Sequence, residues 1–170
     1  MKEIIDLMDQ RIFELLGVGK FYGVCKITSS QSEIFPRTDN TKPEKVAPND
    51  KYPVAIYHRL LDGSIADNED LSFGRTKKRQ NVQQIRTIVI LDTKSDVTIE
   101  DVYEAIPDEV ILCDYKSIWI NSEINLNYNQ NSIREEEWGT AYADKFEMRF
   151  NLYALEYSIE YIKCDADVCC

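Results

Sequence analysis

Apolar and polar positions alternate along this chain with two different periods, and each change of period marks a new expected element. Between residues 2 and 16 the apolar positions recur every three or four residues: Ile5, Met8, Ile12 and Leu15. Gly17 follows this stretch directly. The spacing predicts an amphipathic N-terminal helix that ends at the glycine.

A second helix is predicted after residue 98. Thr98 is a suitable N-cap, and Asp101 lies three residues further on, where its side chain can form a hydrogen bond back to the N-cap backbone. Apolar side chains then follow at helical spacing before Pro107 closes the segment: Ile99, Val102, Tyr103 and Ile106. This pattern predicts a short helix with one apolar face.

Strands are predicted where the period falls to two. Residues 20–28 and 52–60 alternate in this way, and residues 82–91 become apolar on both faces, which is typical of a central strand. Further strands are expected between residues 110 and 126. A C-terminal strand is predicted from five side chains on one face: Tyr153, Leu155, Tyr157, Ile159 and Tyr161.

The connections between these elements are polar. Residues 29–51 contain Pro36, Pro43 and Pro48 and predict a long loop, and residues 62–81 predict a second loop that begins with a turn. Residues 127–147 form an irregular acidic segment with room for a short helix near its middle. The order of elements predicts an α+β fold, with an antiparallel or mixed sheet and two main helices packed on one face.

Length and composition favour one folded domain, residues 1–170. No stretch approaches the roughly 18 consecutive apolar residues of a membrane span, and the acidic N-terminus does not read as a secretory signal, so no membrane partner is expected. The odd set of cysteines does not suggest a disulfide framework: Cys25, Cys113, Cys164, Cys169 and Cys170. A metal site at the C-terminal cysteines is disfavoured, because the spacing gives no CxxC pair.

The net charge of −10 argues against wholesale binding to duplex DNA. One basic stretch departs from this balance: Arg75, Lys77, Lys78, Arg79 and Arg86. It could contact phosphate or an acidic partner, although a solvated loop is the plainer interpretation.

The residues that catalysis needs are scattered or missing. His58, which is the only histidine, lies inside a predicted strand, so a half-buried, hydrogen-bonded structural role is favoured over a nucleophilic triad. Gly17 and Gly19 precede a strand and not a helix, so no phosphate-binding loop is indicated. We therefore expect no enzyme activity, no catalytic residue and no cofactor.

Two further groups have a functional and a plain interpretation. Glu135, Glu136 and Glu137 could serve acid–base or metal chemistry, but three consecutive carboxylates point in different directions, which favours a solvated acidic face. The tyrosines of the C-terminal strand could stack on bases, but Glu156 and Glu160 oppose nucleic acid. A core or subunit interface is the favoured role of the tyrosine face.

The order of elements resembles the tail-terminator or tail-completion family of tailed bacteriophages, whose members form a ring at the head–tail connector. The resemblance is carried by KYPVAIYHRL at residues 51–60, RTKKRQNVQ at 75–83, QIRTIVIL at 84–91 and IEDVYEAI at 99–106. It covers about residues 1–126 and the last strand. The many Asn, Ile, Lys and Tyr residues would suit a phage of the crAss-like group.

This resemblance implies a virion protein that is assembled in the host cytoplasm. Such a subunit contacts itself in a ring and binds neighbouring connector or tail proteins, while DNA passes without specific binding. The family has no catalytic residues to carry over. The alternative hypothesis is a small intracellular protein-binding module or inhibitor without catalysis.

A ring of identical subunits needs two different surfaces that fit each other. The basic residues Arg75, Lys77, Lys78 and Arg79 and the acidic residues Glu135, Glu136 and Glu137 are opposite in sign. The hypothesis is therefore that these two sets meet across the subunit interface.

Overall fold

The computed structural model describes residues 1–29, 33–66, 80–108, 110, 115–120, 124–140 and 143–163. Within these residues, four helices are present: α1 (Lys2–Leu16), α2 (Ile99–Ala105), α3 (Gln130–Trp138) and α4 (Ala143–Met148). They accompany seven strands: β1 (Lys20–Ser29), β2 (Ile34–Thr38), β3 (Val54–Ala66), β4 (Gln80–Asp92), β5 (Tyr115–Ile120), β6 (Asn125–Asn127) and β7 (Phe150–Lys163). The predicted α+β class is confirmed.

The strands form one mixed sheet in the order β2-β1-β3-β4-β7-β5, and β6 also pairs with β7. Strands β1 and β3 run parallel, and every other described pair is antiparallel. The C-terminal strand β7 is inserted between β4 and β5. Because β5 and β6 both pair with the same side of β7, they form two successive pieces of one sheet edge.

Each face of the sheet packs on its own core. Helices α1 and α2 cover one face, where Ile5, Met8, Val102 and the β4 residue Val89 belong to the same cluster. Helices α3 and α4 cover the opposite face, where Trp138 and Phe146 pack with Ile88. The two main helices predicted from the sequence, α1 and α2, do share one face, and the shorter helices α3 and α4 cover the other.

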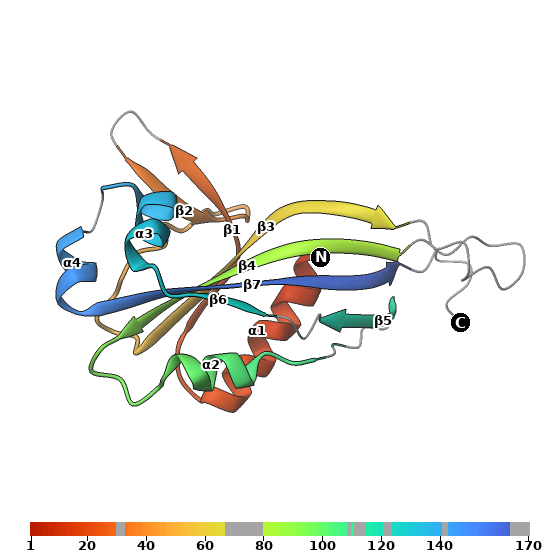
Figure 1. Ribbon diagram of the computed structural model, residues 1–170, viewed down its shortest axis with the longest axis horizontal. Helices are drawn as coiled ribbons and strands as arrows, with labels where there is room; N and C mark the ends of the chain where they lie inside the picture. The colour runs from red at the N-terminus through yellow and green to blue at the C-terminus, as the bar shows by residue number, and fades with distance from the viewer. Residues whose placement is uncertain are drawn as a thin grey trace, which may run out of the picture.

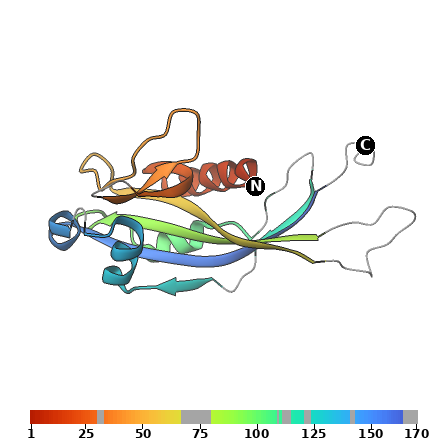
Figure 2. The ribbon, with the colours of Figure 1, turned by 90° about the horizontal axis from the view of Figure 1, so that it is seen from above.

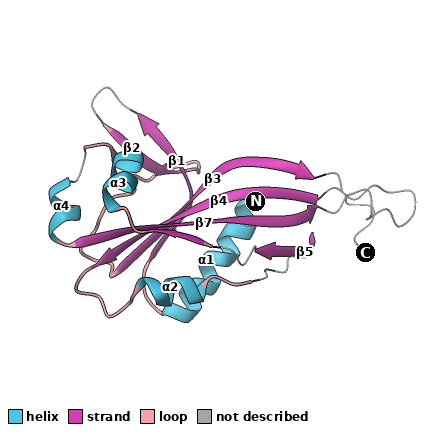
Figure 3. Cartoon of the chain, viewed as in Figure 1, coloured by secondary structure: helices cyan, strands magenta, loops and turns pink. Residues whose placement is uncertain are grey.

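The helices gather over one half of the sheet, and the strands extend beyond them (Figures 1 and 3). We call the extended part the distal half: it comprises residues 59–66 of β3, 80–85 of β4, 157–163 of β7 and strand β5. The same arrangement is seen from above in Figure 2. The helix-covered half therefore holds most of the packing, while the distal half is a ribbon of antiparallel strands.

Local sequence explains both main helices. Ile5, Met8 and Ile12 of α1 are fully buried, and Gly17 ends the helix with φ 69°, a left-handed conformation that glycine adopts without strain. Helix α2 begins with a capping box, in which Thr98 and Asp101 bond reciprocally to each other's backbone. Within the described residues, no helix has the length and apolar character needed to cross a bilayer.

The prediction of an unstructured loop over 29–51 was wrong in its first half. Strand β2 lies there and pairs with β1, opposing Ile27 to Pro36. A proline is tolerated because β2 is a short strand at the sheet margin, and the Pro36 carbonyl still accepts a hydrogen bond from the Val46 amide at 2.9 Å. Tertiary pairing thus overrode the loop-like composition.

The other connections are also shorter than predicted. Strand β3 continues through Asp62 and Gly63 with a register shift instead of turning there, and β4 begins at Gln80, so only residues 67–79 of the 62–81 connection lie outside the described residues. The segment 127–147 is not irregular, since it contains α3 and most of α4. In β1, a register shift beside Gly23 interrupts the predicted alternation, because Phe21 and Val24, three residues apart, both pack on the α1 side of the sheet.

Candidate functional site

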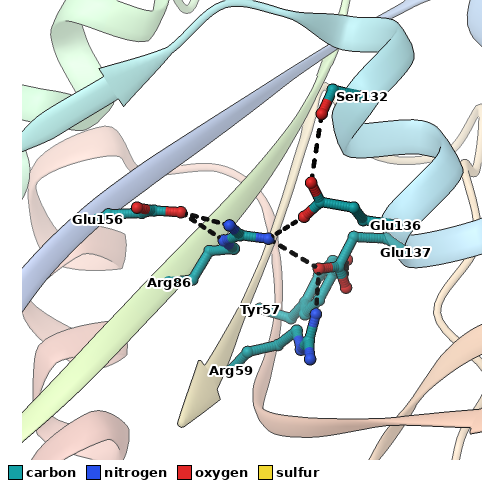
Figure 4. Close-up of polar contacts among 7 residues, drawn as sticks. All are labelled: Tyr57, Arg59, Arg86, Ser132, Glu136, Glu137 and Glu156. Atoms are coloured by element: carbon teal, nitrogen blue, oxygen red, sulfur yellow. Dashed lines mark hydrogen bonds and ion pairs between the residues drawn. The ribbon is translucent and has the colours of Figure 1, made fainter. Parts of the chain in front are cut away.

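An ionic cluster lies between helix α3 and the sheet. Glu137 is fully buried, and its carboxylate accepts hydrogen bonds from the Tyr57 hydroxyl at 2.9 Å and from Arg59 Nη1 at 2.6 Å. Arg86 lies 3.9 Å from the same carboxylate and binds Glu136 and Glu156 on its other sides. Figure 4 shows Glu137 pointing from α3 toward Arg59, while Glu156 approaches Arg86 from β7.

Helix geometry places Glu137 in this position. The helix starts at Asn129, whose side chain accepts a hydrogen bond from the Ser132 amide, and it runs to Trp138. Ile133 and Glu137 are four residues apart and so lie on the same side, and both are buried. Trp138 anchors the same end through a hydrogen bond from its indole to the Val46 carbonyl at 3.1 Å.

The strand register brings two like charges together beneath this helix. Arg59 of β3 pairs directly with Arg86 of β4, and Arg86 in turn pairs with Glu156 of β7. Like charges in directly opposed positions destabilise a sheet, and the buried carboxylate of Glu137 offsets that repulsion. Glu137 therefore fixes α3 to the sheet by charge as well as by packing.

The protonation states fit this role. Burial raises the pKa of Tyr57 well above its usual range, and the charge of Glu137 raises it further, so the hydroxyl stays protonated and donates. Burial lowers the pKa of Arg86, but hydrogen bonds to Glu136 and Glu156 outweigh this effect and leave it raised. The guanidinium is thus always charged. A covered carboxylate whose two oxygens are both bonded is suited to structure rather than to substrate contact.

A second polar chain crosses the sheet on the opposite face. The His58 ring lies 2.8 Å from Asp9 of α1 through Nε2 and 2.7 Å from Thr87 through Nδ1, and Thr87 lies 2.8 Å from the Tyr157 hydroxyl. With a neutral imidazole, Tyr157 donates to Thr87, Thr87 donates to Nδ1 and Nε2 donates to the Asp9 carboxylate. We call these four residues the His58 chain.

The His58 chain has the residue types of an acid–base–hydroxyl triad, but its placement differs. His58 and Thr87 have no exposed surface, and α1 covers them. Burial raises the pKa of Tyr157 above its ordinary value, and the Asp9 charge raises it too, although the bond to Thr87 opposes this. A hydroxyl that a substrate cannot reach cannot act as its nucleophile, so the structure supports the structural role expected of His58.

The residues singled out from the sequence fall into three groups. Arg75, Lys77, Lys78 and Arg79 lie outside the described residues. Glu135 is exposed and Glu136 half-exposed, as expected of a solvated acidic face. That expectation was wrong for Glu137, which lies in the last turn of α3 and is buried against Tyr57 and Arg59 of β3. The proposed contact between the two charged sets stays a prediction.

Two tyrosines of the C-terminal strand have different surroundings. Tyr157 lies in the core, and Tyr153 packs edge-on against Tyr128 with ring centroids 5.9 Å apart.

Cys25 is buried with a free thiol, and burial together with the charge of Asp9 raises its pKa to about 12. The other four cysteines lie outside the described residues. In the part of the chain that is described, no three His, Cys, Asp or Glu side chains are grouped as metal ligands.

Sequence reasoning missed four members of these clusters: Asp9, Tyr57, Arg59 and Thr87. A signal was present, because Tyr57 and Arg59 share one face of a strand whose other face carries His58. Two polar side chains on one face of a buried strand require a partner. Here both have the same partner, Glu137, which lies 80 residues from Tyr57 and 78 residues from Arg59 in the chain. The sequence therefore could not identify Glu137.

The distal half carries two unlike sheet edges. Strand β1 pairs with β3 only as far as His58, and no described strand pairs with residues 59–66 on the side away from β4. Likewise, β5 pairs with β7 on one side, and no described strand occupies its other side. Open backbone donors and acceptors on an edge strand are a template for pairing with another chain.

Comparison with known proteins adds no relative to this picture. No family model matches the chain, and no curated protein matches it.

Proposed function

We propose that this chain is a structural ring subunit of a phage head–tail connector or tail, which joins head to tail and surrounds the DNA channel. The proposal rests on the sequence resemblance together with one observation: the distal half ends in two different open edges, β3 and β5. Its partners are copies of itself and the neighbouring connector or tail proteins, in a virion assembled in the host cytoplasm.

The directions of the strands support joining β5 of one copy to β3 of the next. Strands β3, β4, β7 and β5 are antiparallel to one another in sequence across the sheet. A β5 strand placed beside the β3 edge of another copy would therefore continue the antiparallel alternation. Because the two edges differ, the contact is head-to-tail, and such a contact closes into a ring when its rotation allows.

Closing the ring also removes a liability. In an isolated subunit, the outer sides of β3 residues 59–66 and of strand β5 have no partner among the described strands, and exposed edges of this length favour aggregation. A closed ring would pair both of these edges with a neighbour. The acidic excess of the chain suits a protein that surrounds DNA, since like charge keeps a polyanion from adhering.

A substitution at the β3 edge tests the proposal. Leu60 is 39% exposed and sits where the edge opens, so Leu60→Lys places a charge beside the incoming strand at little cost to the fold. We expect the wild-type protein to form rings and the variant to remain monomeric with an unchanged circular dichroism spectrum. Light scattering and negative-stain microscopy distinguish the two outcomes.

Met148→Lys is the matched control, because Met148 is 78% exposed on α4, away from both edges. It should assemble normally. Hydrogen exchange gives a direct readout, since the amides of residues 59–66 and 115–120 should become protected on assembly. Monomers at the highest attainable concentration would contradict the ring, whereas rings without this protection would contradict only the edge contact.

A further inference from the structure

A groove lies between the C-terminal end of α1 and helix α2. It has a volume of about 430 Å³, and its apolar lining includes Leu15, Leu16 and Val97. In Figures 1 and 2, this end of α1 points away from the distal half. The groove is thus separate from the sheet edges, and its occupation would not depend on a ring.

The apolar stripe of α1 continues past the core into this groove. Ile5, Met8 and Ile12 on that stripe have no exposed surface, but Leu15, one turn further on, is 71% exposed. A leucine that extends a buried stripe and stays open to solvent is an apolar contact available to another molecule.

The charges around the groove have a single sign. Asp96, Asp101 and Glu104 line it, and none of the described residues lining it is basic. A backbone hydrogen bond from Thr98 lowers the pKa of Asp101, which keeps this carboxylate ionised. The carbonyl end of α1 adds partial negative charge, and its last turn contains no basic residue to offset it.

We propose that this groove binds a segment of a partner protein in which a large aliphatic or aromatic side chain is flanked by Lys or Arg. The apolar side chain would pack on Leu15, Leu16 and Val97. The basic side chains would pair with Asp96 and Glu104, which have no ion pair with another described residue. Apolar contact supplies affinity, and the acidic rim selects the partner.

The test is a selection from a random peptide library displayed on beads, with the wild-type full-length chain as target. The enriched peptides should share an apolar residue next to Lys or Arg. A labelled enriched peptide should bind at least about tenfold more weakly to the variant Asp96→Lys/Glu104→Lys, because two ion pairs become repulsions. Leu15→Ser should weaken binding as well, and added salt should weaken binding to the wild type.

The matched control for charge is Glu135→Lys, an exposed reversal on the opposite face of the sheet, which should leave binding unchanged. All substituted positions are exposed or line the groove, and circular dichroism verifies that each variant is folded. The proposal is overturned if no peptide is enriched, if the enriched peptides lack basic residues, or if they bind the reversed-groove variant as tightly as the wild type.

Discussion

The two faces of the sheet bury polar groups in different ways. On the α1 face, the His58 chain links four elements through single hydrogen bonds, and each of its members is less than a tenth exposed. On the α3 face, one fully buried carboxylate, Glu137, holds two arginines that still reach solvent, with side-chain exposures of 26% for Arg59 and 20% for Arg86.

This difference shows how each helix is attached. Helix α1 buries Ile4, Ile5, Met8 and Ile12 completely, so apolar packing holds it and the His58 chain fixes its register. Helix α3 buries only Ile133 and Trp138 besides Glu137, so charge has a larger share in holding it. The α3 face should therefore be more sensitive to loss of a single side chain than the α1 face.

The largest expected effect is at Glu137. Glu137→Ala removes the carboxylate between Arg59 and Arg86 and leaves the Tyr57 hydroxyl without its acceptor. Breaking a buried ion pair from one side costs about 3–5 kcal/mol in free energy of unfolding. Urea denaturation with an unchanged m-value measures this loss.

The neighbouring carboxylate provides the control. Glu135 is on the same helix but exposed, so Glu135→Ala should change the free energy of unfolding by no more than about 0.5 kcal/mol. Equal losses for the two variants would mean that the cluster does not hold α3, and the contrast between the faces would fail.

A smaller effect is expected at His58. His58→Leu keeps a similar volume but leaves Asp9 and Thr87 without the ring nitrogens, which costs about 1–3 kcal/mol in free energy of unfolding. Tyr157→Phe removes only the last hydrogen bond of the chain and should cost about 1 kcal/mol. Thermal unfolding of both variants checks this order.

Assembly tests the structural role of His58 independently. If its role is structural, His58→Leu should still form the oligomers of the wild-type protein at temperatures below its unfolding transition. A variant that remains folded yet loses a measurable chemical activity would contradict the role assigned to the His58 chain.

The smallest effect is a dependence on acid. A hydrogen bond from Arg149 holds the pKa of Asp92 below its ordinary value of 3.8. A depressed folded-state pKa stabilises the fold above the unfolded-state value, and this stabilisation is lost as the pH falls through the folded-state pKa. Asp92→Asn should therefore destabilise the protein near neutral pH and differ less from wild type below about pH 4.

Denaturant unfolding at neutral and acid pH measures this difference. Asp108→Asn is the control, because Asp108 is an exposed carboxylate beyond α2. It should show no such convergence with the wild type. A gap between Asp92→Asn and wild type that persists in acid would mean that the pair with Arg149 contributes nothing that depends on charge.

How far the sequence predicted the fold varies from element to element. The bounds of α1 and the capping box of α2 were predicted closely, because both depend on residues within one or two turns. Strand β2 was missed, since its proline, Pro36, and its polar neighbours resemble a loop until β1 pairs with it. Among the candidate site residues, the burial of His58 was partly predicted from strand alternation, but that of Glu137 was not.

The sequence by itself determined the α+β class, the two main helices and the apolar faces of β3, β4 and β7, because hydrophobic periodicity is a local property of the chain. Only the tertiary structure decided that β7 inserts between β4 and β5, that Glu137 lies between two arginines and that Asp9 reaches His58. Each of these contacts joins residues at least 39 positions apart. Such pairings depend on how whole elements pack, and that information is not contained in any short stretch of sequence.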